Sequence, residues 1–260
     1  MAVVTVLYLV YLLTPIALLV LGSVGETWSN TMLPQGTTLR WFEAVLADRS
    51  FRQAFWTSLA VCAATVATCT LVGTPLAYAL YAAASRRVRL AARILHLLPV
   101  AVPAIVLGFG FMLVFSTDAL PYLGSTWVLV GGHVVLALPY LLQTLIGDMR
   151  HLGLDRLELA AESLGASFPQ RFRDVVLPAL RHSLLSGSIM VAALSIGEFQ
   201  LSNLIAGFMN RTYPIVLLQA FYGATGFACA ATVVLIALAL LASVTGAVAA
   251  RGAGVRGAAA

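Results

Sequence analysis

The stretch Leu154–Leu180 has the sequence LDRLELAAESLGASFPQRFRDVVLPAL and lies between two long apolar runs. It belongs to a polar segment, residues 147–182, that we call the polar loop. A chain that crosses a membrane usually keeps its connections short, whereas this connection has the pattern of two small amphipathic helices. Such a loop is more typical of a docking element than of a linker.

The first predicted helix of the polar loop begins at Asp155, which is a suitable N-cap residue. Glu158 follows three residues later, in the spacing of a capping box. Gly165 is the residue type that ends a helix in the left-handed conformation. We therefore predict a short helix that starts at Asp155 and stops at Gly165.

The second predicted helix starts at Ser167, because Pro169 is tolerated in a first helical turn. Phe168 and Phe172 fall on its apolar face. If the loop were solvated on all sides, both aromatic rings would be exposed to water. We therefore expect the loop to dock against a partner.

The composition identifies the chain as an integral membrane protein of the all-α class. It is 61% hydrophobic and 10% charged, with a mean hydropathy of +0.97. At about 20 residues for each span, 260 residues provide six transmembrane helices and no separate soluble domain. The apolar segments are 3–22, 54–83, 94–117, 127–146, 183–207 and 228–250.

The orientation follows from the distribution of arginine, since the chain contains no lysine. Eleven of the 15 basic residues fall in residues 85–93, the polar loop and the tail 251–260, which share one side of the six-span arrangement. The positive-inside rule places that side in the cytoplasm, together with both termini. The basic balance thus indicates membrane orientation, and no nucleic-acid partner is expected.

The polar loop resembles the EAA loop of binding-protein-dependent ABC importer permeases. That family's pattern is approximately E-A-A-x-x-x-G, nine residues, then I-x-L-P. Here Ala160-Ala161, Gly165 and Leu177-Pro178 occupy the matching register. Leu159 stands where the family usually has Glu, with Glu158 one place earlier, and Val175 replaces Ile.

The resemblance implies the fold and the role of a type I (MetI-like) importer permease in a bacterial inner membrane. It implies a cytoplasmic ABC ATPase dimer, a second permease that is identical or homologous, and an external substrate-binding protein as partners. ATP and Mg would be bound by the ATPase, so this chain has no cofactor or catalytic residue of its own. The absence of lysine agrees, because a GxxxxGK[ST] phosphate loop needs one. The residues implied for ATPase coupling are Glu158, Ala160, Ala161, Gly165, Phe168, Phe172, Leu177 and Pro178.

Three regions follow from this interpretation. Residues 1–53 form the first transmembrane helix and an external segment. Residues 54–250 form a five-helix permease core that contains the polar loop, and residues 251–260 form a cytoplasmic tail.

Glu198 is the one acidic residue well inside a predicted span, where an unpartnered carboxylate costs about 3 kcal/mol. Ser195, Glu198 and Ser202 would share one helical face, with Asn203 close by. This polar stripe either lines a translocation path or its outer gate, or forms a hydrogen-bonded contact with a second subunit. His133 is interpreted as a packing histidine, and no metal site is expected.

The substrate expectation rests on two stretches, LPQGTTLRWF (33–42) and SIGEFQLSNLI (195–205). Both are similar to the polyamine, iron(III) and phosphonate branch of the family, and 2-aminoethylphosphonate is the best candidate. A polyamine or iron(III) is the alternative. An alternative of another class is a membrane-embedded enzyme, although neither HExxH nor GxSxG is present.

Overall fold

A computed structural model describes residues 2–28, 31, 33–83 and 85–240. These residues form helices joined by loops, with two isolated β-bridges, so the all-α prediction is confirmed for the described part. The chain divides into two compact units. Among the described residues, unit 1 covers the ranges 2–57 and 211–240, and unit 2 covers the range 58–210.

Unit 1 is held by an aromatic core. Its elements are α1 (Ala2–Val24), α2 (Arg40–Ala47), the first residues of α3 (Arg49–Ala82), α12 (Tyr213–Phe221) and the helix Thr225–Leu240. The ring of Phe51 packs edge to face against those of Tyr213 and Phe227, at centroid distances of 5.3 and 5.2 Å. In α2, the indole of Trp41 donates a hydrogen bond to the carbonyl of Gly25 at 2.8 Å.

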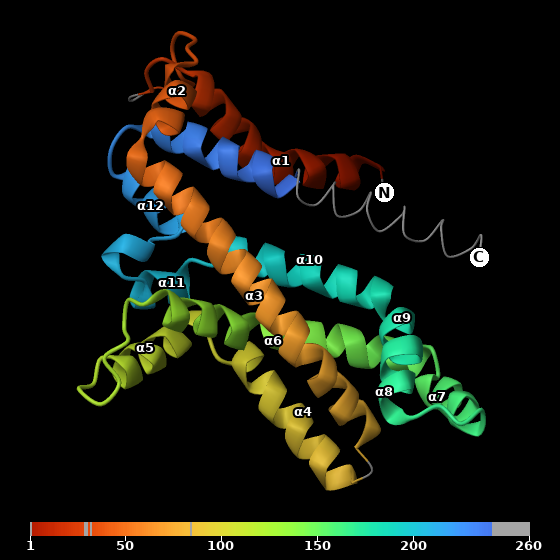
Figure 1. The fold of residues 1–260 in the computed structure, drawn as a ribbon. Coiled ribbons are helices and arrows are strands. Elements are labelled where there is room, and N and C mark those ends of the chain that lie inside the picture. Colours follow the sequence, from red (N-terminus) through yellow and green to blue (C-terminus); the bar gives the residue numbers. More distant parts are fainter. Residues whose placement is uncertain (1, 29–30, 32, 84, 241–260) are drawn as a thin grey trace. The chain divides into compact units, whose positions relative to one another are not determined.

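Unit 2 contains most of the helices (Figure 1). Beyond the rest of α3, they are α4 (Arg86–Ala101), α5 (Ala104–Phe115), α6 (Thr126–His151), α7 (Leu154–Ser163), α8 (Phe168–Arg171), the π-helix η1 (Phe172–Val176), α9 (Leu177–Ala179), α10 (Arg181–Gly197), α11 (Gln200–Ile205) and the 3-10 helix η2 (Phe208–Asn210). The helices α6 and α10 lie side by side. Gly187 of α10 allows the two helices to approach closely, because a Cβ at this position would lie 2.5 Å from Cδ1 of Leu141 in α6.

Three described helices are long and apolar enough to cross a membrane: Val3–Val24, Arg49–Ala82 and Thr126–His151. The pair Phe168–Ala179 and Arg181–Gly197, bent by 66°, would form a fourth span if counted as one. The three long helices coincide with the first, second and fourth predicted spans, and the bent pair overlaps the fifth, 183–207, only as far as Gly197. The sixth, 228–250, begins in the helix Thr225–Leu240 and continues outside the described residues, as does the tail 251–260.

The third predicted span, 94–117, is divided into α4 and α5. The break falls at Val102, whose backbone is extended (φ −91°, ψ 128°), directly before Pro103. A residue that precedes proline disfavours the helical conformation, because its backbone meets the proline ring. The local sequence therefore explains why these 24 residues are not one helix.

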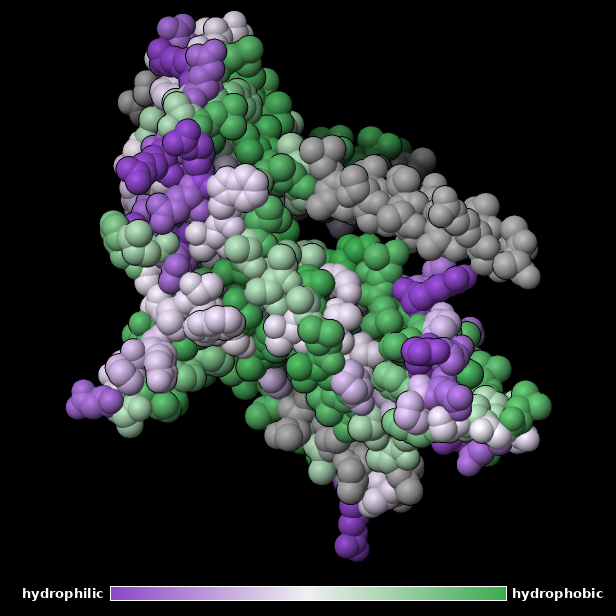
Figure 2. All heavy atoms as spheres, viewed as in Figure 1, coloured by the Kyte–Doolittle hydropathy of each residue, from purple (hydrophilic) through white to green (hydrophobic). Residues whose placement is uncertain are grey.

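Apolar side chains cover much of the surface of these helices. Leu71, Leu113 and Trp127 are each more than two-thirds exposed. Figure 2 shows broad hydrophobic areas on the face in view, with hydrophilic residues gathered around α2 and at the polar loop. Such a surface is suited to lipid contact.

The short helix α11 packs tightly against α6 at a glycine. A Cβ at Gly132 would lie 2.7 Å from Cδ2 of Leu201 and 2.9 Å from Cδ1 of Ile205, and both side chains are fully buried. Its neighbour Gly131 has no atom within 4 Å of such a Cβ. Gly132 thus faces α11 and leaves no room for a side chain, whereas a side chain at Gly131 would enter open space.

We expect Gly132→Ala to destabilise the protein by about 1–3 kcal/mol, because the extra methyl group overpacks the α6–α11 contact. Gly131→Ala is the matched control. It should leave stability unchanged or raise it by up to about 1 kcal/mol, since alanine favours a helix more than glycine does. Thermal unfolding of both variants in detergent measures the difference, and equal midpoints would contradict the packing argument.

Candidate functional site

The fifth predicted span, 183–207, is interrupted at Glu198, its one acidic residue. Helix α10 ends at Gly197, and the backbone of Glu198 is extended (φ −72°, ψ 125°) before α11 begins at Gln200. The break leaves the first backbone N–H groups of α11 without helical acceptors. In apolar surroundings each such group needs a partner.

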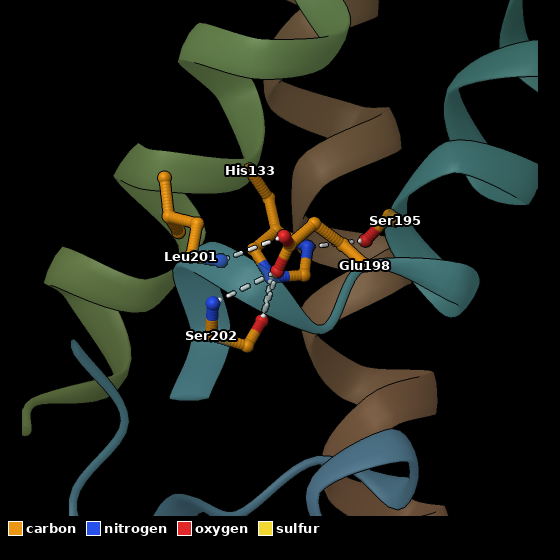
Figure 3. A network of polar contacts seen from close by, with 5 residues as sticks. All are labelled: His133, Ser195, Glu198, Leu201 and Ser202. Atoms are coloured by element: carbon orange, nitrogen blue, oxygen red, sulfur yellow. Dashed lines mark hydrogen bonds and ion pairs between the residues drawn. The ribbon is translucent and has the colours of Figure 1, made fainter. Parts of the chain in front are cut away.

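The carboxylate of Glu198 supplies those acceptors (Figure 3). Its Oε1 accepts a hydrogen bond from the backbone N–H of Leu201 at 2.8 Å, and its Oε2 accepts one from that of Ser202, also at 2.8 Å. The hydroxyl of Ser202 donates a third bond to Oε2, at 2.6 Å. An ionised carboxylate is suited to this position, because it only accepts hydrogen bonds.

His133 of α6 joins this network from the other side. Its Nδ1 lies 2.8 Å from the Ser195 hydroxyl, and its Nε2 lies 2.8 Å from that of Ser202. Because Ser202 donates its only hydroxyl proton to Glu198, it must accept from Nε2–H of His133. In the neutral ring, Nδ1 then accepts from Ser195. The bonds form one directed chain from Ser195 through His133 and Ser202 to Glu198 (Figure 3).

The network is almost closed to solvent. His133 is 2% exposed, and Ser195 and Ser202 are buried. The interpretation of His133 as a packing histidine with satisfied nitrogens is confirmed, but its partners are the predicted polar stripe itself. Asn203, the fourth residue of that stripe, is exposed and lies outside the network.

The expectation that Ser195, Glu198 and Ser202 share the face of one continuous helix is wrong. The helix ends before Glu198, and the three side chains meet because the chain turns around the carboxylate. Gly197, directly before the glutamate, was the sequence signal for this break, since glycine is a poor helix former.

Within the polar loop, α7 is bracketed by two left-handed glycines. Gly153 precedes it (φ 60°) and Gly165 follows it (φ 84°). The N–H of Gly165 bonds the carbonyl of Glu162 at 2.9 Å, and the N–H of Ala166 bonds that of Ala161 at 3.1 Å. This pair of bonds is a Schellman motif, so the predicted turn at Gly165 is confirmed.

The predicted start of α7 is wrong. The helix begins at Leu154 after Gly153, and no side chain caps it. Asp155 and Glu158 do not form a capping box, because both carboxylates accept hydrogen bonds from the tyrosines at the end of α3. Tyr81 donates to Asp155 at 3.2 Å, and Tyr78 donates to Glu158 at 2.8 Å.

The second helix of the loop starts at Ser167 as predicted, where the backbone N–H of Ser167 bonds Oε1 of Gln170 at 2.7 Å. It continues into the π-helix η1, in which the N–H of Leu177 bonds the carbonyl of Phe172, five residues back. Pro178 follows and has no N–H to donate. This wider turn leads into α9 and reaches the start of α10.

Phe168 and Phe172 pack within the chain, which corrects the argument that a partner must cover them. The ring of Tyr78 lies 5.8 Å from that of Phe168 and 5.5 Å from that of Phe172. Phe172 is half-buried, and Phe168 stays 52% exposed.

A different set of side chains faces solvent on the polar loop. Leu159, which takes the place of the usual glutamate, is 63% exposed, and Leu164 is 89% exposed. Ala160 is exposed beside them and Ala161 is half-buried. On the opposite side, Leu154 and Leu180 are fully buried against the end of α6.

Residues 70–252 match the family described as binding-protein-dependent transport system inner membrane component. The chain is 29% identical to the putative 2-aminoethylphosphonate transport system permease protein PhnV of Salmonella typhimurium, over 91% of this chain and 88% of that protein. It is 33% identical to the molybdenum transport system permease protein ModB of Mycobacterium tuberculosis, over 67% of this chain and 70% of that protein.

The fold is also similar to that of a solved structure. It matches a bacterial ABC transporter involved in the import of the acidic polysaccharide alginate, with a TM-score of 0.78 over 95% of this chain and 92% of that chain. The sequence identity is 14%, so this likeness shows the fold alone.

We expect Glu198→Gln to lower the stability of the protein by about 1–3 kcal/mol, because the amide NH₂ must face an N–H donor of α11. The measurement is the thermal unfolding midpoint in detergent. The control is Gln200→Ala, an exposed position on the same short helix, which should leave the midpoint unchanged. A midpoint for Glu198→Gln equal to that of the unchanged protein would refute the capping role.

Proposed function

We propose a specific transport role from the premise that the chain belongs to the family of binding-protein-dependent transport system inner membrane components. It is accordingly a permease of an ABC importer. We further propose that its transported substrate is 2-aminoethylphosphonate. The observation that supports this substrate is the similarity to PhnV, which extends over nearly the full length of both chains. The similarity to the molybdenum permease covers a smaller part of the chain.

We propose three kinds of partner: a cytoplasmic ATPase dimer, a second permease and an external binding protein. The family description supports the binding protein. The exposed leucines of the polar loop support docking, because Leu159 and Leu164 present apolar surface on a charged loop. A partner ATPase would hold ATP and Mg, since the chain has no lysine for a phosphate loop.

Within the polar loop we propose that the residues divide into two groups. Ala160 and Phe168, which are exposed, take part in the docking surface. Ala161, Gly165 and Phe172 shape the helix–turn–helix behind it, while Leu177 and Pro178 lead the chain back towards α10. Glu158 accepts a hydrogen bond from Tyr78 within the chain.

For the polar stripe we propose a role at the gate of the translocation path. Glu198 already accepts three hydrogen bonds, which favours holding α11 in place over binding the ammonium group of a substrate. Ser202 binds this carboxylate directly, and Ser195 is linked to it through His133 and Ser202. Asn203 is exposed on α11 and is the residue of the stripe best placed to meet solute.

The arginine distribution supports a bacterial inner-membrane protein with the polar loop and both termini in the cytoplasm. This orientation places α11 and the loop before α6 on the external side.

The test of the proposed function is reconstitution. The permease is purified with candidate ATPase, second-permease and binding-protein subunits from the same genome and placed in proteoliposomes containing ATP. We expect uptake of labelled 2-aminoethylphosphonate that requires both the binding protein and ATP. Molybdate, spermidine and iron(III) serve as competitors. Uptake of one of these compounds without uptake of 2-aminoethylphosphonate would identify that compound as the substrate. A single chain that is active without an ATPase would favour the enzyme alternative.

We expect Gly165→Val to lower transport by about tenfold in a transporter complex that still assembles normally. A β-branched residue at φ 84° costs about 1–2 kcal/mol in backbone strain and displaces the turn that shapes the docking surface. Gly147→Ala is the control, because Gly147 lies in α6 with no atom within 4 Å of an added Cβ. Normal transport by the Gly165→Val complex would refute the role of this turn in ATPase coupling.

A further inference from the structure

We propose that Tyr78 and Tyr81 are positioning residues that attach the polar loop to α3, so that a displacement of the loop moves this span directly. The inference rests on the proposed function, in which a partner ATPase moves the loop. It adds the residues through which that movement would enter the membrane helices. It also gives the displaced glutamate, Glu158, a role.

Two tyrosine–carboxylate pairs join α3 to α7. The hydroxyl of Tyr78 donates to Oε1 of Glu158 at 2.8 Å. The hydroxyl of Tyr81 donates to Oδ1 of Asp155 at 3.2 Å and accepts from the backbone N–H of Asp155, also at 3.2 Å. Each helix contributes residues three positions apart, which lie on one helical face. The order is reversed between the helices, so the end of α3 and α7 pair in antiparallel register.

Tyr78 contacts both helices of the polar loop. Its hydroxyl binds Glu158 of α7, while its ring packs edge to face against Phe172 of η1, with the centroids 5.5 Å apart. Phe168 of α8 lies against the same ring at 5.8 Å. One side chain of the span thus holds the two halves of the loop together.

The tyrosine–carboxylate hydrogen bonds restrict the relative position of α3 and α7. Apolar packing also joins the loop to the bundle, because Ala77 of α3 shares a buried cluster with Leu154 and Leu180. Packed aliphatic groups resist separation but specify sliding less strictly than directed bonds do. Charge-assisted hydrogen bonds are both stronger and geometrically restrictive. The two tyrosine pairs therefore fix the register of α7 along α3.

The displaced glutamate, Glu158, contacts a residue of the membrane span. The family's glutamate position holds Leu159, whose side chain is 63% exposed. The carboxylate one residue earlier is rotated by about 100° around the helix axis and binds Tyr78. The shift by one position turns an acidic residue from the outer surface of α7 towards the span, and leaves an apolar residue outside.

The experiment compares the unchanged complex with a Tyr78→Phe/Tyr81→Phe double variant and each single variant. These substitutions keep both rings and remove only the hydroxyls. Two quantities are measured in the complete reconstituted transporter: solute transported per ATP hydrolysed, and hydrogen exchange of the backbone amides in 154–163. Tyr222→Phe is the matched control, because that side chain is 85% exposed.

We expect the double variant to assemble and hydrolyse ATP while its transport per ATP falls about three- to tenfold, the range that corresponds to the net free energy of a hydrogen bond. Exchange in 154–163 should become faster. Glu158→Ala should have the effect of Tyr78→Phe, and combining them should add nothing further, because both remove the same bond.

An unchanged transport-to-ATP ratio in the assembled double variant would overturn the proposal. A purely stabilising role would lower the yield of complex and leave that ratio unaltered. Failure of the proposed function is a separate result, visible as absence of ATP-driven uptake by the unchanged complex. In that case unchanged exchange in 154–163 would still refute the attachment of α7 to α3. If the double variant does not assemble, the single variants decide by the same ratio.

Discussion

Every break in a helix of this protein must supply hydrogen-bond partners for the backbone groups that it frees. Inside a bilayer no water is available to do so, and each unsatisfied group costs several kcal/mol. At the junction of α10 and α11 the carboxylate of Glu198 meets this requirement with three accepted bonds. The close contact of α11 with Gly132 depends on that junction, because the position of the short helix is set by where its first turn is capped.

Polar side chains of unit 2 also join segments that are distant in the sequence. His133 is held between two serines and completes a chain of bonds that ends on the carboxylate. In the polar loop, Asp155 and Glu158 are turned towards tyrosines of α3. Charged groups thus join neighbouring segments of the chain, while leucines of the loop remain on its outer side. That distribution is suited to a loop that belongs mechanically to the bundle and offers an apolar surface to a partner.

Much of the fold followed from local patterns. The long helices α1, α3 and α6 correspond to apolar runs, since hydropathy alone predicts a span. The turn at Gly165 was predicted because glycine is the residue that adopts a left-handed backbone without strain. The division of the third predicted span was missed, although Pro103 marks it. The predicted capping box at Asp155 does not form, because this carboxylate makes a tertiary hydrogen bond with Tyr81.

The sequence by itself determined that the chain is an all-α membrane protein with a helix–turn–helix between two spans. These properties depend on hydrophobicity and on the backbone preferences of glycine and proline, which act within a few residues. Only the tertiary structure decided the partners of the polar groups. Ser195 and His133 are 62 positions apart in the chain, and Tyr78 and Glu158 are separated by 80. Such pairs form because helix packing brings their elements together, and no local pattern encodes which distant side chain will be opposite.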